Sequence, residues 1–133
     1  MIIGVGTDLV ETKRLESLWL RWGARIARRL LGPQEQHIFF QRLSQGAQAQ
    51  SVAINYLAKR FAAKEAVGKA LGCGLSSPMS LQNLEVLNDE KGAPQVVARG
   101  QLAELLDAKG WIIHLSISDE RSHAQAFALV ESR

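Results

Sequence analysis

SVAINYLAKRFAAKEAVGKAL, residues Ser51 to Leu71, is the stretch of sequence that decides the fold. It contains no proline, and Gly72-Cys73-Gly74 directly after it allows a left-handed helix cap. Apolar and small residues recur in it at helical spacing and gather on one side: Ile54, Leu57, Ala58, Phe61, Ala62 and Gly68. The pattern predicts a long helix packed on the core along that side. Lys59, Arg60 and Lys64 fall away from the centre of the stripe.

The segments on either side predict further helices before this one and strands after it. Glycines interrupt an apolar N-terminal strand over Ile2–Val10, which indicates a buried strand that another backbone approaches closely. Turn residues separate the remaining segments. We expect helices at Glu11–Trp22, Arg25–Leu31, Pro33–Leu43 and Gln101–Lys109, and strands at Leu84–Leu87, Gln95–Ala98, Trp111–Ser118 and Ala124–Val130. This order predicts one α+β domain, residues 1–133, with a small, mostly antiparallel sheet on the long central helix.

The composition is that of a globular protein in a reducing compartment. Hydrophobic residues make up 47% of the 133 residues and charged residues 22%, so disorder is not expected. Cys73 is the only cysteine, which excludes an intramolecular disulfide and a multi-thiolate zinc site. The first residues resemble no signal peptide, and no apolar run approaches the roughly 20 residues that span a bilayer. We expect a cytoplasmic protein without a membrane partner.

A basic cluster follows the first strand, and Glu16 is the only acidic residue within it. Such a cluster attracts nucleic acid, an anionic membrane or an acidic protein, although a solvated helix face has the same composition. Leu18, Trp19 and Trp22 lie in the same segment and are either core residues or an apolar patch for docking a protein. The basic residues are Lys13, Arg14, Arg21, Arg25, Arg28 and Arg29.

Glu65 stands in the middle of the apolar stripe of the long helix. A carboxylate there is costly unless it is paired or bound to a metal. The structural alternative is an ion pair with Lys69 at i,i+4, worth only about 0.2–0.5 kcal/mol. Such a pair is typical of surface helices, so the pattern favours a functional site.

Asp8 comes near the end of the first strand, on the face that also carries Gly4 and Gly6. Its spacing to Glu11 is that of a capping box, so Asp8 could cap the following helix. A carboxylate can also cap a helix and bind a metal at the same time. If Asp8 meets Glu65, two carboxylates without histidine or thiolate favour Mg²⁺ together with substrate phosphates.

Other chemical motifs are weak. The Gly4-x-Gly6 pair lacks the third glycine and the βαβ unit of a dinucleotide site. Cys73 has no base placed near it by the sequence and is more typical of a small core or loop residue. The three histidines show no metal-ligand spacing. Cationic residues on the long helix could instead contact phosphate, namely Arg60, Lys64 and Lys69.

Three segments in series resemble the holo-[acyl-carrier-protein] synthase family of phosphopantetheinyl transferases, in its short single-unit form. The likeness covers nearly the whole chain. The first segment is Gly4–Glu11, GVGTDLVE; the second is Arg60–Ala70, RFAAKEAVGKA, followed by Gly72-Cys73-Gly74; the third is Asn88–Pro94, NDEKGAP, followed by His114–Ser118, HLSIS.

The resemblance implies a phosphopantetheinyl transferase fold and a magnesium-dependent enzyme of fatty acid biosynthesis. Such an enzyme moves 4′-phosphopantetheine from coenzyme A to a serine of apo acyl carrier protein and releases 3′,5′-ADP. The resemblance implies Asp8 and Glu65 as Mg²⁺ ligands, Glu65 or a metal-bound water as the base, and Lys69 beside the reacting phosphate. It also implies a homotrimer with active sites between subunits. The coenzyme A contacts would be Arg60, Lys64 and Lys69, and the carrier-protein contacts Arg14, Arg21 and Arg25.

Two positions depart from the family pattern. Asp119 stands where some members have a histidine that helps to bind coenzyme A, and Ala93 replaces a lysine that is common in that turn. Two other interpretations compete with the transferase. A basic nucleic-acid-binding module would leave Glu65 unexplained, and a structural subunit would use Asp8 as a cap and pair Glu65 with Lys69.

Overall fold

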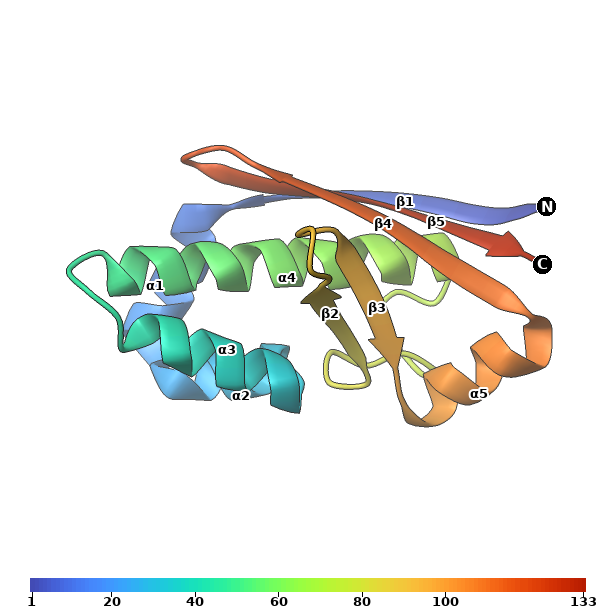
Figure 1. Ribbon diagram of the computed structural model, residues 1–133, viewed down its shortest axis with the longest axis horizontal. Coiled ribbons are helices and arrows are strands. Elements are labelled where there is room, and N and C mark those ends of the chain that lie inside the picture. The colour runs from blue at the N-terminus through green and yellow to red at the C-terminus, as the bar shows by residue number, and fades with distance from the viewer.

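Helix α4 (Ala49–Leu71) runs through the middle of the molecule, with a sheet on one side and the helices α2 and α3 on the other (Figure 1). This computed structural model describes residues 1–133. All predicted helices and strands are present, so the predicted α+β class is confirmed. The other elements are α1 (Thr12–Trp22), α2 (Ala24–Leu30), α3 (Pro33–Leu43), α5 (Gly100–Lys109), β1 (Ile2–Glu11), β2 (Leu84–Asn88), β3 (Pro94–Ala98), β4 (Trp111–Asp119) and β5 (His123–Ser132).

The strands form two antiparallel sheets instead of one. Strands β1, β5 and β4 form a three-stranded sheet in that order, and β2 and β3 form a separate hairpin. Along β5, small residues alternate toward α4 and are buried, and their size lets the sheet lie close to the helix. These residues are Ala124, Ala126, Ala128 and Val130.

The glycines of β1 bring this strand into direct contact with the backbone of α4. A Cβ atom at Gly6 would lie 2.1 Å from the carbonyl oxygen of Ala66, and one at Gly4 would lie 2.1 Å from that of Ala70. No residue larger than glycine fits at either position without a shift of the backbone. The predicted close approach of two backbones is therefore confirmed, and the partner of β1 is the central helix.

The opposite face of the three-stranded sheet is exposed and apolar. Val5 and Leu9 project from it on β1, and Phe127 projects beside them on β5; Leu9 is 63% exposed and Phe127 47%. The prediction of a buried β1 is therefore wrong for this face, because only α4 covers the sheet and it covers one side.

The far side of α4 is covered as well. Helix α3 and strand β2 pack there, so residues all round the middle of α4 are buried. Arg60 is 4% exposed and Lys64 is fully buried. The expectation that α4 packs on the core along one side only is therefore wrong, because a second layer covers the side that carries Arg60 and Lys64.

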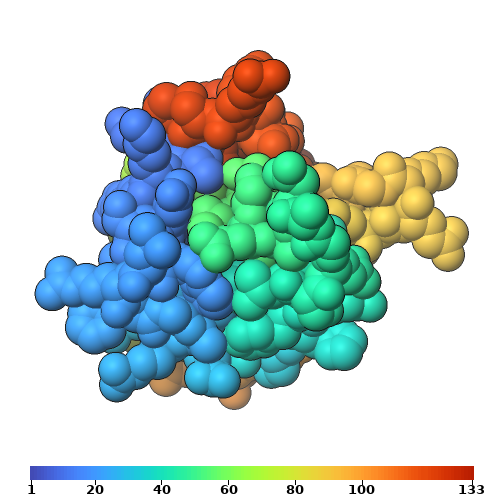
Figure 2. Space-filling model, turned by 90° about the vertical axis from the view of Figure 1, so that its left-hand side faces the viewer, coloured from blue at the N-terminus to red at the C-terminus, as the bar shows by residue number.

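The hairpin of β2 and β3 carries a turn that projects from the body of the molecule, as the gold segment in Figure 2 shows. The side chain of Asp89 organises this turn, because its Oδ1 accepts hydrogen bonds from the backbone N–H groups of Lys91 and Ala93. None of the helices is both long and apolar enough to cross a membrane.

Candidate active site

Asp8 lies inside β1, opposite Ala126 of β5, with its side chain on the face that packs on α4. Strand β1 continues to Glu11 and α1 begins at Thr12, where no side chain caps the helix. The capping interpretation of Asp8 is therefore wrong, because the residue sits four positions before the helix. Its side chain is 17% exposed, so it is mostly buried but still reaches solvent.

Lys69 links the helix to the strand. Its Nζ donates to the carbonyl oxygen of Thr7 at 2.9 Å and to Oδ1 of Asp8 at 3.1 Å. The alternative ion pair between Glu65 and Lys69 does not form; the lysine turns to Asp8 instead. The side chain of Lys69 is 53% exposed, so its ammonium group is accessible at the surface.

Glu65 lies one helical turn before Lys69, the residue that contacts Asp8, and the charge of Asp8 reaches it. Partial burial raises the pKa of Glu65, and the negative charge of Asp8 raises it further, while Lys69 and Arg14 oppose the rise. Two carboxylates at a partly open surface match the donors that a divalent cation takes. Mg²⁺ commonly uses only one or two protein carboxylates and completes its six oxygens with water and substrate phosphate. The donor set of Asp8 and Glu65 fits that ion.

Lys64 does not join this site. Its Nζ donates to the carbonyl oxygens of Leu30 at 2.9 Å and Leu81 at 2.6 Å, and it forms an ion pair with Glu35. Burial lowers the pKa of Lys64, and the charge of Glu35 opposes this effect. All three donors of the ammonium are used, so the prediction that Lys64 contacts coenzyme A is wrong: the residue faces α3 and β2.

Arg60 and Glu65 lie on different faces of α4, and the face that carries Arg60 is not the one that packs on β1 next to Asp8. Its guanidinium stacks over the ring of Tyr56, 4.5 Å from the centroid, and its Nη2 donates to Oδ1 of Asn88 at 3.2 Å. Its buried Nε has no partner. Arg60 lines a pocket together with Arg42, Tyr56 and Asn88, so within one chain it does not share a site with Asp8.

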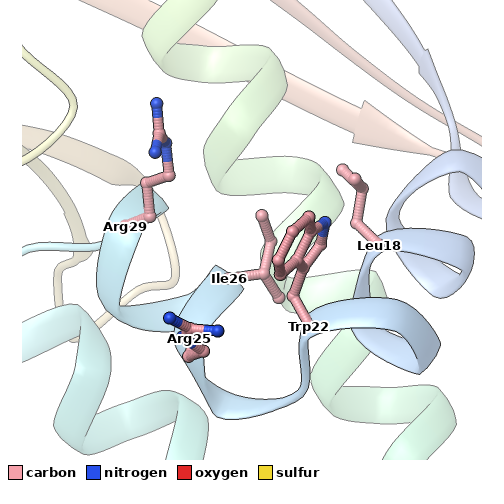
Figure 3. A pocket seen from close by; sticks show the side chains of 5 residues that line it. All are labelled: Leu18, Trp22, Arg25, Ile26 and Arg29. Atoms are coloured by element: carbon pink, nitrogen blue, oxygen red, sulfur yellow. The ribbon is translucent and has the colours of Figure 1, made fainter.

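The basic helices α1 and α2 present the predicted docking residues to solvent. Arg14, Arg21 and Arg25 are all exposed. Figure 3 shows a pocket between these helices, in which Trp22 and Ile26 lie side by side with Arg25 nearby; Leu18 and Arg29 complete its lining. The guanidinium groups of Arg21 and Arg25 lie 5.1 Å and 5.9 Å from the ring of Trp22.

Arg14 connects this basic surface to the carboxylates. Its guanidinium lies over the ring of Phe61, 5.7 Å from the centroid, and Phe61 is one helical turn before Glu65 on α4. The influence of Arg14 on the pKa of Glu65 reflects the same proximity. The basic surface and the two carboxylates are therefore continuous.

Some groups that hold the lysines and arginines in place were not predicted from the sequence. A backbone carbonyl such as that of Thr7 carries no sequence signal. Glu35, which pairs with Lys64, and Glu85, which pairs with Arg99, are fully buried. The start of a helix at Gly32-Pro33 was the available signal for Glu35, because acidic residues favour a first turn. Asp119 is exposed at the end of β4.

Comparison with known proteins places the chain in a family. The profile of the 4′-phosphopantetheinyl transferase superfamily matches residues 4–129. A holo-[acyl-carrier-protein] synthase of Methylibium petroleiphilum is 41% identical over 133 residues, which is 100% of this chain and 98% of that relative. The chain therefore belongs to the 4′-phosphopantetheinyl transferase superfamily.

Solved structures agree with this placement. The crystal structure of holo-[acyl-carrier-protein] synthase from Neisseria meningitidis superposes with a TM-score of 0.88 at 38% identity, covering 99% of this chain and 100% of that one. A holo-(acyl-carrier-protein) synthase from Bacillus anthracis in complex with CoA (3′,5′-ADP) gives 0.80 at 32% identity, with 100% and 99% covered. The predicted phosphopantetheinyl transferase fold is confirmed.

Proposed function

We propose that this protein transfers the 4′-phosphopantetheine group from coenzyme A to a serine hydroxyl of an apo acyl carrier protein. The products are the holo carrier protein and 3′,5′-ADP. The observation that carries the proposal is the convergence of Asp8 from β1 with Glu65 and Lys69 from α4 in a chain of this superfamily. The serine oxygen forms a bond to the β-phosphorus, and the bond from that phosphorus to the bridging oxygen breaks.

Asp8 and Glu65 would hold Mg²⁺. When bound, the ion neutralises charge on the pyrophosphate and on the transferring group. Without it, the two carboxylates repel both each other and the phosphates. Partial burial raises the pKa of Glu65, and the repulsion from Asp8 raises it further.

Lys69 is placed to contact the reacting phosphate. Two of its three donors are used by the carbonyl oxygen of Thr7 and by Asp8, so one remains for a phosphate oxygen. Because Thr7 and Asp8 hold the ammonium in place, its charge is already aimed at the site before substrate binds. Preorganised charge of this kind is the main source of catalysis in phosphoryl transfer.

Glu65 is the base that this chain offers for the serine proton. In the metal-free chain, partial burial and the charge of Asp8 raise its pKa, and a Mg²⁺ ion bound to the same carboxylate would oppose that rise. The continuity of the site with Arg14 supports delivery of the serine from the basic surface.

We propose that α1 and α2 bind the acidic carrier protein through Arg14, Arg21 and Arg25. An apolar pocket flanked by arginines (Figure 3) matches an acidic helix that carries one apolar side chain toward the pocket. The exposed ring of Trp22 and the arginines over it provide both components. Nucleic acid is the alternative anionic partner of such a surface, and a steeply salt-dependent affinity for RNA or DNA would favour it.

We also propose a homotrimer whose subunits associate through the exposed apolar face of the three-stranded sheet. Val5, Leu9 and Phe127 on this face gain most from burial. In such an assembly, Arg60 would contact the coenzyme A bound by a neighbouring subunit, which accounts for its separation from Asp8 within one chain. Its unpartnered Nε and the nearby Arg42 support a phosphate contact there. Cytoplasmic fatty acid biosynthesis is the setting that this substrate pair implies.

The test is a transfer assay with coenzyme A, Mg²⁺ and apo acyl carrier protein, followed by mass spectrometry of the carrier protein. The wild type should produce holo carrier protein, whereas Asp8→Ala and Glu65→Ala should produce none while keeping the wild-type circular dichroism spectrum. The matched control is Asp107→Ala, an exposed carboxylate on α5, which should keep full activity. Wild-type rates from either site variant would refute the proposal.

A further inference from the structure

An ionic network lies beneath α4, on the side that faces α3 and β2. Its members, in order of contact, are Lys64, Glu35, Glu85 and Arg99; we call them the buried ionic network. Lys64, Glu35 and Glu85 are fully buried, and only Arg99 reaches solvent. Burying charges is costly, and apolar residues of similar size often give equal or greater stability. Stability alone therefore does not explain why charged residues occupy this part of the core.

The hydrogen bonds of the network are complete around Glu35. Its Oε1 accepts from Lys64 and from the backbone N–H of Gly32, and its Oε2 accepts from the backbone N–H of Val86. Glu85 Oε2 accepts from the backbone N–H of Glu35 at 2.8 Å, and its other oxygen pairs with Arg99. Around Glu35, where both carboxylate oxygens have hydrogen-bond partners, the network tolerates few alternative geometries.

The network connects four parts of the chain to one point on α4. Lys64 binds the carbonyl oxygen of Leu30 at the end of α2 and that of Leu81 before β2. Glu35 adds the first turn of α3, and Glu85 adds β2 itself. On another face of α4, the backbone of β1 contacts the helix through Gly4 and Gly6. The contact at Lys64 is made one residue before Glu65.

We propose that Lys64, held by the buried ionic network, is a positioning residue that sets the rotation of α4 and so the direction of the Glu65 carboxylate. The inference rests on the function proposed above. Lys64 touches neither substrate nor metal. It acts on Glu65 only through α4, the helix that carries both residues.

The size of the effect follows from helix geometry. Side-chain ends lie about 5–6 Å from a helix axis, so a rotation of about 10° moves the Glu65 carboxylate by about 1 Å. A displacement of about 1 Å at a reacting centre can lower a rate about 100-fold. Small rotations of α4 therefore matter for the direction of the Glu65 carboxylate.

The test compares Lys64→Met with Lys59→Met, the same change five residues earlier on α4, where no ion pair is lost. The probe is Mn²⁺ binding in the presence of coenzyme A, measured by electron paramagnetic resonance, together with kcat and both KM values. Lys64→Met alone leaves the buried charge of Glu35 without its partner. The double variant Glu35→Gln/Lys64→Met removes that charge as well and is therefore more certain to fold. Melting curves establish that each variant is folded.

We expect wild type and Lys59→Met to bind Mn²⁺ equally. Folded Lys64→Met, and the double variant, should bind it at least about 10-fold more weakly and lose about 10–100-fold in kcat, with the KM for carrier protein nearly unchanged. Either variant matching Lys59→Met in metal affinity overturns the inference. If neither Lys64→Met nor the double variant folds, the test uses Arg99→Gln, at the solvent-exposed end of the buried ionic network. An unchanged Mn²⁺ affinity of Arg99→Gln then overturns the inference. Failure of the wild type to bind Mn²⁺ or to transfer phosphopantetheine would instead count against the proposed function.

Discussion

Replacing Gly6 by alanine should separate the two carboxylates of the site without touching either of them. The new Cβ would lie 2.1 Å from the carbonyl oxygen of Ala66, whereas ordinary contact begins at 3.4 Å, so β1 and α4 must move apart by about 1.3 Å. Asp8 lies two residues further along β1 and moves with the strand. Glu65 belongs to the helix and does not follow.

Two consequences are expected. Overpacking of this kind costs about 1–3 kcal/mol, which lowers the melting temperature of a domain of this size by roughly 4–12 °C. Displacement of Asp8 from Glu65 by more than 1 Å should lower kcat about 100-fold. The measurements are thermal unfolding by circular dichroism and the transfer assay, run well below the melting temperature.

The control is Gly110→Ala, at the end of α5. Gly110 has a φ of +64° with nothing within 4 Å of its Cβ position, so alanine there strains the backbone by about 1–2 kcal/mol but moves no site residue. Gly110→Ala should therefore lose stability and keep its kcat. A folded Gly6→Ala variant with the wild-type kcat would refute the argument that glycine contact sets the distance between the carboxylates.

Three further predictions concern charge and assembly. Burial and the charge of Asp8 raise the pKa of Glu65. Between the ordinary glutamate pKa and this raised pKa, Glu65 is protonated in the folded state but ionised in the unfolded state. The free energy of unfolding therefore falls as the pH rises through that range. Glu65→Gln should accordingly melt higher than wild type at pH 7 without Mg²⁺, and the gain should vanish below the ordinary glutamate pKa of about 4.3; equal melting temperatures at both pH values would contradict this. Arg21→Glu should raise the KM for carrier protein at least about 10-fold and leave coenzyme A binding unchanged; an equal loss of both affinities would remove the docking assignment. Leu9→Lys should yield a folded monomer in analytical ultracentrifugation, because Leu9 is exposed in the single chain, whereas Val52→Lys, also exposed but outside the sheet, should leave the assembly as in the wild type; an unchanged oligomer for Leu9→Lys would show that another surface is used.

Much of the fold could be predicted because its signals are local. Helix α4 ends at Leu71 and is capped by Gly72, which has a φ of +82°, as the glycines after Leu71 indicated. The helix begins at Ala49, two residues earlier than predicted. Alternation along β1 correctly put Gly4 and Gly6 on one face and Val5 and Leu9 on the other. Prediction failed where a second layer was involved: the periodicity of α4 revealed one packed side, and nothing in it revealed that α3 and β2 cover the other.

The candidate site was predicted in part for the same reason. Glu65 and Asp8 stood out because each is a carboxylate in apolar or glycine-rich surroundings. Lys64 was misplaced because a lysine on a helix is usually exposed, and only its distant partner Glu35 makes burial tolerable. The pair of Lys69 with Glu65 was only the structural alternative, and the acceptors of Lys69 belong to β1 instead.

The sequence by itself determined the elements, the glycine face of β1 and the two acidic residues of the site, because these follow from periodicity and residue type within short segments. Tertiary structure alone decided that Lys69 pairs with Asp8, 61 residues away, that Lys64 is buried against Glu35, 29 residues away, and that an apolar sheet face stays open. Those outcomes depend on which charges and surfaces meet when separate segments pack. Packing follows from the sum of many contacts over the whole chain, and no local pattern contains it.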